Sequence, residues 1–100
     1  MKLNSELKLV RLVSGEEIIA DVTEMTDSVN LKRGYVLIPG GEGNLAYMPF
    51  MPYTKAENGL TISKDKIVFI VEPVEELAKQ IKHQQSGIIV PEKGIVTWEK

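Results

Sequence analysis

Most of residues 7–71 alternate apolar and polar side chains with the two-residue period of β-strands. Turn residues divide this region into strands, which we expect at residues 7–13, 17–25, 29–38, 45–53, 60–62 and 66–71. In the second of these strands Ile18, Ala20 and Val22 share one face, which predicts that the strand is half-buried. Gly34 stands inside the third strand and predicts a kink or a bulge there. The pattern indicates a mainly β protein built from short strands.

A helical period follows the strands, over residues 73–83. Its apolar positions have the i, i+3, i+4, i+7 spacing of one helix face and are Val74, Leu77, Ala78 and Ile81. Pro73 suits the first helical position, and Gly87 suits a stop. Beyond the helix, residues 88–91 and 95–98 predict two short strands. We expect the helix to cover an open side of the β structure.

The fourth expected strand, residues 45–53, contains two prolines and the densest aromatic and methionine cluster of the chain. Pro49 and Pro52 have no N–H to donate to a β-ladder, so the strand lies at an edge, contains a bulge or ends there. The clustered side chains are Tyr47, Met48, Phe50, Met51 and Tyr53. These side chains either pack in the core of one chain or form an interface between chains. Their number exceeds what one strand face buries, which favours an interface.

The composition changes this picture mainly by exclusion. A chain of 100 residues, 43% of them hydrophobic and 26% charged, fits one globular domain. Its formal net charge of −2 argues against bulk electrostatic attraction to nucleic acid. No apolar run approaches the roughly 20 residues that span a bilayer, and residues 1–8 are too polar and too short for a signal peptide. We therefore expect a cytoplasmic protein with no membrane partner.

Residues for catalytic chemistry are scarce. Cysteine is absent, which excludes disulfides and thiolate metal sites. The single histidine, His83, does not form a zinc site by itself, and no recognisable motif places a nucleophile beside it. The glutamate pairs at residues 16–17 and 75–76 fit a turn and a helix start. We expect neither an enzymatic activity nor a cofactor.

Two motifs in order along the chain resemble those of a known family. In the first, Gly15 and Asn30 stand fifteen residues apart, and the apolar positions in and after this interval are Ile18, Val22, Met25, Val29 and Leu31. The second runs over residues 62–70, with the sequence ISKDKIVFI. Together they are similar to the motifs of the Sm-like (LSm) family, above all to its divergent, phage-encoded members. Ser63 and Lys64 stand where that family has an arginine and a glycine.

The resemblance implies a fold and an assembly. The fold is a small, bent, five-stranded Sm-like (SH3-like) barrel over residues 1–72, and the helix and tail, residues 73–100, pack on the same domain. The assembly is a homo-oligomeric ring of about five to seven subunits. Strands 45–53 and 67–71 would pair neighbouring subunits, which hides their open edges. The candidate interface residues are Tyr47, Phe50, Met51, Tyr53, Val68 and Ile70.

The resemblance also implies a site for single-stranded RNA. Family members hold one base per subunit between residues of two turns, which transfers here to the candidates Ser28, Asn30, Ser63 and Lys64. Lys32 and Lys66, with Lys64 and Arg33, are candidates for contacts to the phosphates. An amide such as that of Asn30 can read a uracil-like edge, but Ser28 cannot stack on a base. Asn30 has a second interpretation, in which it ties down its own turn through bonds to the backbone.

Two functions remain open at this point. The first is a ring that binds single-stranded RNA weakly, which the Gly15–Asn30 motif favours. The alternative is an Sm-like structural or protein-interaction module with no RNA binding, which Ser28, Ser63 and the acidic balance favour.

Overall fold

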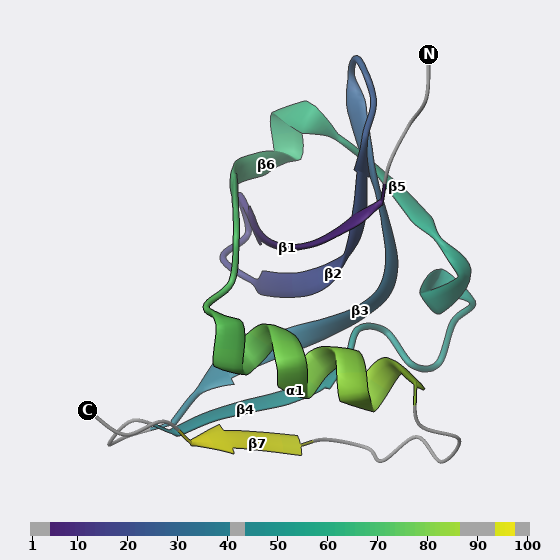
Figure 1. Ribbon diagram of the computed structural model, residues 1–100. Coiled ribbons are helices and arrows are strands. Elements are labelled where there is room, and N and C mark those ends of the chain that lie inside the picture. Colours follow the sequence, from purple (N-terminus) through teal and green to yellow (C-terminus); the bar gives the residue numbers. More distant parts are fainter. Residues whose placement is uncertain (1–4, 41–43, 87–93, 98–100) are drawn as a thin grey trace.

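The computed structural model describes residues 5–40, 44–86 and 94–97, which form one curved antiparallel sheet with a helix against one face (Figure 1). The elements are β1 (Glu6–Leu12), β2 (Glu17–Glu24), β3 (Ser28–Pro39), β4 (Asn44–Pro49), the 3-10 turn η1 (Ala56–Asn58), β5 (Leu60–Ser63), the 3-10 turn η2 (Lys64–Lys66), β6 (Ile67–Val71), α1 (Glu75–Ser86) and β7 (Gly94–Thr97). The strand order is β6-β1-β2-β3-β4-β7, and β5 pairs with β3 outside this path. The expectation of a mainly β protein with one helix after residue 72 is confirmed.

The long strand β3 bends the sheet, because its two halves have different partners. Its first half pairs with β5 and its second half with β4, while β2 pairs with both halves. The β2–β3 register shifts between Ile19 and Asp21, opposite Arg33 and Gly34. Arg33 has a φ of 54°, and a Cβ at Gly34 would lie 3.1 Å from Ile18 Cγ2. The bulge that Gly34 predicts is therefore present, and a glycine there avoids a crowded contact.

The curved sheet buries apolar side chains on both faces. One core cluster, on the concave side, consists of Val10, Ile18, Ala20, Val22, Val29 and Leu31. The other lies under α1 and consists of Ile19, Tyr35, Leu37, Tyr47, Leu77 and Ile81. Neighbouring residues of a strand point to opposite faces, so Ile18 and Ile19 enter different clusters. This explains why both side chains are fully buried.

The helix lies across β3 and β4 in Figure 1 and starts later than the sequence predicts. The first helical hydrogen bond runs from the Ala78 N–H to the Val74 carbonyl, at 3.0 Å, and the helix continues to Ser86. Leu77 and Ile81 are buried against the sheet, as the apolar spacing predicts. In the part of the chain that the structure describes, no helix has the length and apolar character needed to cross a bilayer.

The resemblance implies five strands over residues 1–72, whereas the described part of this region contains six, β1 to β6, and β7 adds a seventh strand to the sheet. The expected strand 45–53 ends at Pro49, so Pro49 marks a strand end rather than an edge strand. The expected tail strand 95–98 appears as β7, which pairs with β4, whereas the expected strand 88–91 lies outside the described residues. β5 and β6 also belong to the sheet as separate strands, joined by η2. No ladder joins β5 to β6 within the described residues, so hydrogen bonds there do not close the sheet into a barrel.

Candidate functional site

The residues that the resemblance assigns to an RNA site come together on the β3–β5 pair. Ser28 lies opposite Ser63, and Asn30 lies opposite Thr61. Residues directly opposite each other in an antiparallel pair project from the same face. We call this surface, made by Ser28, Asn30, Thr61 and Ser63, the serine face. The intervening side chains of β3 enter the concave core, so the serine face lies on the outside of the sheet.

The two turns beside the serine face also meet, as the resemblance implies. The Lys64 N–H donates to the Asp27 carbonyl at 3.0 Å, which joins η2 to the β2–β3 turn. The structure therefore places Ser28, Asn30, Ser63 and Lys64 next to one another, although they come from segments far apart in the sequence.

The Asn30 side chain is held inside this surface. Its Nδ2 donates to Thr61 Oγ1 at 3.2 Å. Gly59 packs against the same amide, because a Cβ at Gly59 would lie 3.4 Å from both Asn30 Nδ2 and Oδ1. The partner is thus a threonine of the neighbouring strand and not the backbone of the Asn30 turn. Thr61 is absent from the sequence-based site, because strand pairing cannot be read from the local pattern.

The lysines near the serine face lie among carboxylates. Lys64 Nζ lies 3.6 Å from Glu24 Oε1, and both side chains are exposed. Asp27 and Asp65 lie in the same two turns as Lys64 and Lys66, so the turns carry acidic as well as basic residues. Such a surface attracts phosphates weakly.

The remaining cations are placed farther along β3. Lys32 is exposed and lies opposite Asp21 in the β2–β3 pair. Arg33 binds the carboxylate of Asp21 through Nε at 2.9 Å and Nη2 at 2.5 Å. Arg33 is therefore in an ion pair, whereas none is found for Lys32 among the described residues.

Tyr47, predicted at a subunit interface, lies in the core instead. Its side chain is 1% exposed, and its ring meets that of Tyr35 edge-on, with the centroids 5.5 Å apart. Gln80 Nε2 donates to the Tyr47 hydroxyl at 3.0 Å, and this hydroxyl donates to Gln84 Oε1 at 3.2 Å. The interface prediction is wrong for Tyr47, and core packing explains it. Tyr35 is buried in the same cluster, and this burial raises the pKa of its hydroxyl above the usual value.

The other predicted interface residues divide into two groups. Phe50 and Ile70 pack against the concave core, and Met51 is half-buried. Tyr53 and Val68 are 83% and 56% exposed, respectively. Tyr53 and Val68 therefore remain accessible to a neighbouring subunit, Val68 only in part.

β6 presents an unpaired edge, whereas β4 does not. β6 pairs with β1 on one side, and no described strand pairs with it on the other. Val68, Phe69 and Val71 expose apolar surface along it. The strand 45–53 is expected to pair with a neighbouring subunit, but its first part is occupied in this structure, because residues 44–47 of β4 pair with β7. We use the name β6 edge for the open side of β6 together with the exposed side chains of Val68, Phe69 and Val71.

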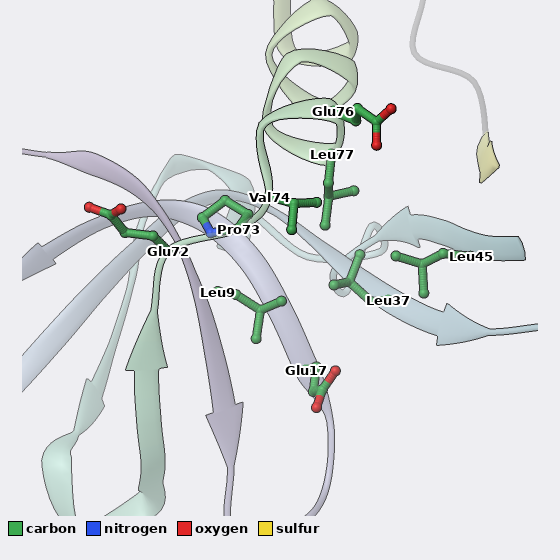
Figure 2. A pocket seen from close by; sticks show the side chains of 9 residues that line it. All are labelled: Leu9, Glu17, Leu37, Leu45, Glu72, Pro73, Val74, Glu76 and Leu77. Carbon is green, nitrogen blue, oxygen red and sulfur yellow. The ribbon is translucent and has the colours of Figure 1, made fainter. Parts of the chain in front are cut away.

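A cleft of about 480 Å³ lies between the start of α1 and the sheet (Figure 2). Its lining consists of Leu9, Glu17, Leu37, Leu45, Glu72, Pro73, Val74, Glu76 and Leu77. In Figure 2, Val74 and Leu77 lie above Leu9 and Leu37. We call this space the α1 cleft. Sequence reasoning missed it because its lining comes from segments far apart in the chain.

The carboxylates of the α1 cleft have exposed or partly exposed partners. Arg11 Nη1 lies 3.1 Å from Glu17 Oε2, and Lys8 Nζ lies 3.5 Å from Glu72 Oε2. Burial alone would lower the pKa of Lys8, but the carboxylates of Glu6 and Glu72 outweigh it and raise this pKa. Glu76 forms no ion pair with the described residues.

No protein-family model matches the chain, and no curated protein matches its sequence. Among the described residues, no three His, Cys, Asp or Glu side chains are grouped so that they could hold a metal ion. The serine face, the β6 edge and the α1 cleft are therefore the surfaces from which a function has to be argued.

Proposed function

We propose that this chain is a self-assembling Sm-like module that binds protein, beginning with copies of itself. The observation that supports this function best is the β6 edge, which combines an unpaired strand side with exposed Val68, Phe69 and Val71. An open apolar edge is a template for pairing with another strand. The Gly15–Asn30 motif and the run of pairs from β6 through β1, β2 and β3 to β5 support the Sm-like identity.

The partner of the β6 edge would be β5 of the next copy. β5 pairs with β3 on one side and has no second partner among the described strands. β4 is the less suitable strand, because β7 occupies its other edge. Pairing of two different edges is heterologous, and it closes into a ring when the rotation between copies allows. We therefore propose a homo-oligomeric ring of about five to seven chains.

A charge on the β6 edge is expected to dissociate the assembly. Val68 is 56% exposed, so Val68→Lys leaves the core intact and places an ammonium group where a neighbouring strand would pack. Light scattering at micromolar concentration is expected to give an oligomer for the unchanged chain and a monomer for Val68→Lys.

Val74→Lys is the matched control, since Val74 is 58% exposed and lies on the helix side. It is expected to remain oligomeric. A monomeric unchanged chain, or a Val68→Lys variant of full oligomeric mass, would contradict the proposal.

RNA binding is a second candidate, favoured by the gathering of Ser28, Asn30 and Ser63 on the serine face. Three observations argue for weak binding at most. The Asn30 amide is bonded to Thr61, Lys64 has a carboxylate partner, and no aromatic side chain stands at Ser28. A missing stacking contact costs about 1–3 kcal/mol per base.

We expect oligo(U) to bind no more tightly than oligo(A) or single-stranded DNA, and all binding to fall as salt rises. Fluorescence anisotropy at two salt concentrations measures this. Asn30→Ala is expected to change nothing, as is the control Lys79→Ala on the exposed side of α1. Selective oligo(U) binding that weakens in Asn30→Ala alone would instead establish the serine face as an RNA site.

A further inference from the structure

We propose that the α1 cleft binds a peptide segment of a partner protein in which an apolar side chain stands next to a lysine or an arginine. The cleft lies between α1 and the sheet, whereas self-assembly is proposed through the β6 edge. The two surfaces can therefore be tested separately.

The apolar part of this specificity follows from the lining. Leu9, Leu37 and Leu45 come from three different strands, and Pro73, Val74 and Leu77 come from the start of the helix. The volume of about 480 Å³ lies within the range of ligand-binding clefts, roughly 300–1,000 Å³. Val74 is 58% exposed although it is apolar and lines the cleft, so water is in contact with surface that a ligand would cover.

The basic part follows from the charges around this lining. Glu17 lies on β2, Glu72 follows β6 and Glu76 lies in the first turn of α1, so carboxylates from three segments border one apolar space. Glu17 and Glu72 have lysine or arginine partners at the protein surface, where such pairs contribute little and can be exchanged. Figure 2 shows the three glutamates on different sides of the apolar lining, so a lysine or an arginine of the ligand would reach one of these carboxylates at the border of the cleft at small cost.

The same charges disfavour other occupants. A helix start attracts anions, but Glu75 and Glu76 in the first turn already interact with the positive end of the helix dipole. Phosphates and fatty acids would meet like charge. A second copy brings no net positive charge to this cleft, since the chain has a formal net charge of −2; the β6 edge is apolar and does not require a basic partner. A basic, apolar peptide is the class that complements both features.

A selection from a library of short random peptides, displayed against the full-length chain, tests the proposal. We expect the recovered peptides to be enriched in an apolar residue flanked by lysine or arginine. Binding of the best peptide should shift the methyl resonances of Leu9, Leu37, Leu45 and Val74. The double variant Glu72→Gln/Glu76→Gln should bind this peptide about three- to tenfold more weakly.

Glu57→Gln/Asp65→Asn is the matched control, because it removes two exposed carboxylates away from the cleft lining. It should leave the affinity unchanged, as should Val68→Lys at the β6 edge. Val74→Ser should weaken binding by loss of apolar contact without reducing its salt dependence.

Several results would overturn the proposal. These are a selection without enrichment or with acidic peptides, methyl shifts confined to the β6 edge, and equal affinity for the two double variants. Concentration-dependent shifts of the cleft methyl groups in Val68→Lys without peptide would identify a second copy as the occupant. Stronger shifts with indole than with the peptide would identify a small-molecule site. None of these outcomes depends on whether the unchanged chain forms a ring.

Discussion

Replacing Tyr47 by alanine is expected to lower the free energy of unfolding by about 3–5 kcal/mol. The side chain is 1% exposed and contacts the Tyr35 ring, so the truncation leaves a cavity under α1. It also removes the hydroxyl that bonds Gln80 and Gln84. Tyr47→Phe keeps the ring, so its expected cost is only about 1 kcal/mol for the lost hydrogen bonds. Urea unfolding followed by circular dichroism measures both values.

Tyr53→Ala is the matched control, because Tyr53 is 83% exposed. It is expected to change the free energy of unfolding by less than about 0.5 kcal/mol. If Tyr47→Ala kept its stability and only reduced the oligomeric mass, the side chain would be an interface residue and its core position would be refuted.

Ile81→Ala is expected to destabilise the whole described fold by about 2–5 kcal/mol. Ile81 is 0% exposed and packs with Leu77 into the cluster that includes Ile19 of β2. Helix and sheet therefore share one core, and they should unfold together. The helical signal at 222 nm and the near-ultraviolet signal of the tyrosines are expected to give the same urea midpoint.

Lys82→Ala provides the comparison on the exposed side of α1, where the expected change is within about 0.5 kcal/mol. Separate midpoints for the two signals in Ile81→Ala, with the tyrosine signal unchanged from that of the unmodified chain, would show that α1 unfolds independently. The shared core would then not couple helix and sheet.

The candidate site was predictable in its membership but less so in its chemistry. The resemblance assigned Ser28, Asn30 and Ser63 to one site, and the β3–β5 pairing brings these residues together. The motifs did not predict Thr61, whose hydroxyl accepts a hydrogen bond from the Asn30 amide. They also did not predict Glu24, which pairs with Lys64. Both partners depend on which strand or turn lies alongside, and this is a long-range property of the chain.

The α1 cleft could not be predicted from the sequence at all, because its lining depends on packing between distant segments. Leu9, Leu37 and Leu45 each look like ordinary inward residues of separate strands. They line one cleft only because α1 packs over the sheet and leaves its first turn raised above β1 and β3. No local pattern reports the gap that remains after such packing.

The sequence by itself determined the local structure of this protein. The two-residue alternation, the helical stripe ending at Ile81 and the glycine at the β3 bulge act over short distances, so they can be read from neighbouring residues. Only the tertiary structure decided that β7 covers the second edge of β4 and that Tyr47 lies under the helix. The alternation of apolar and polar residues shows that a strand has one buried face, but it does not show which element covers that face. The register and the partner of each strand come from packing between distant segments, and these decide which surfaces remain open to bind.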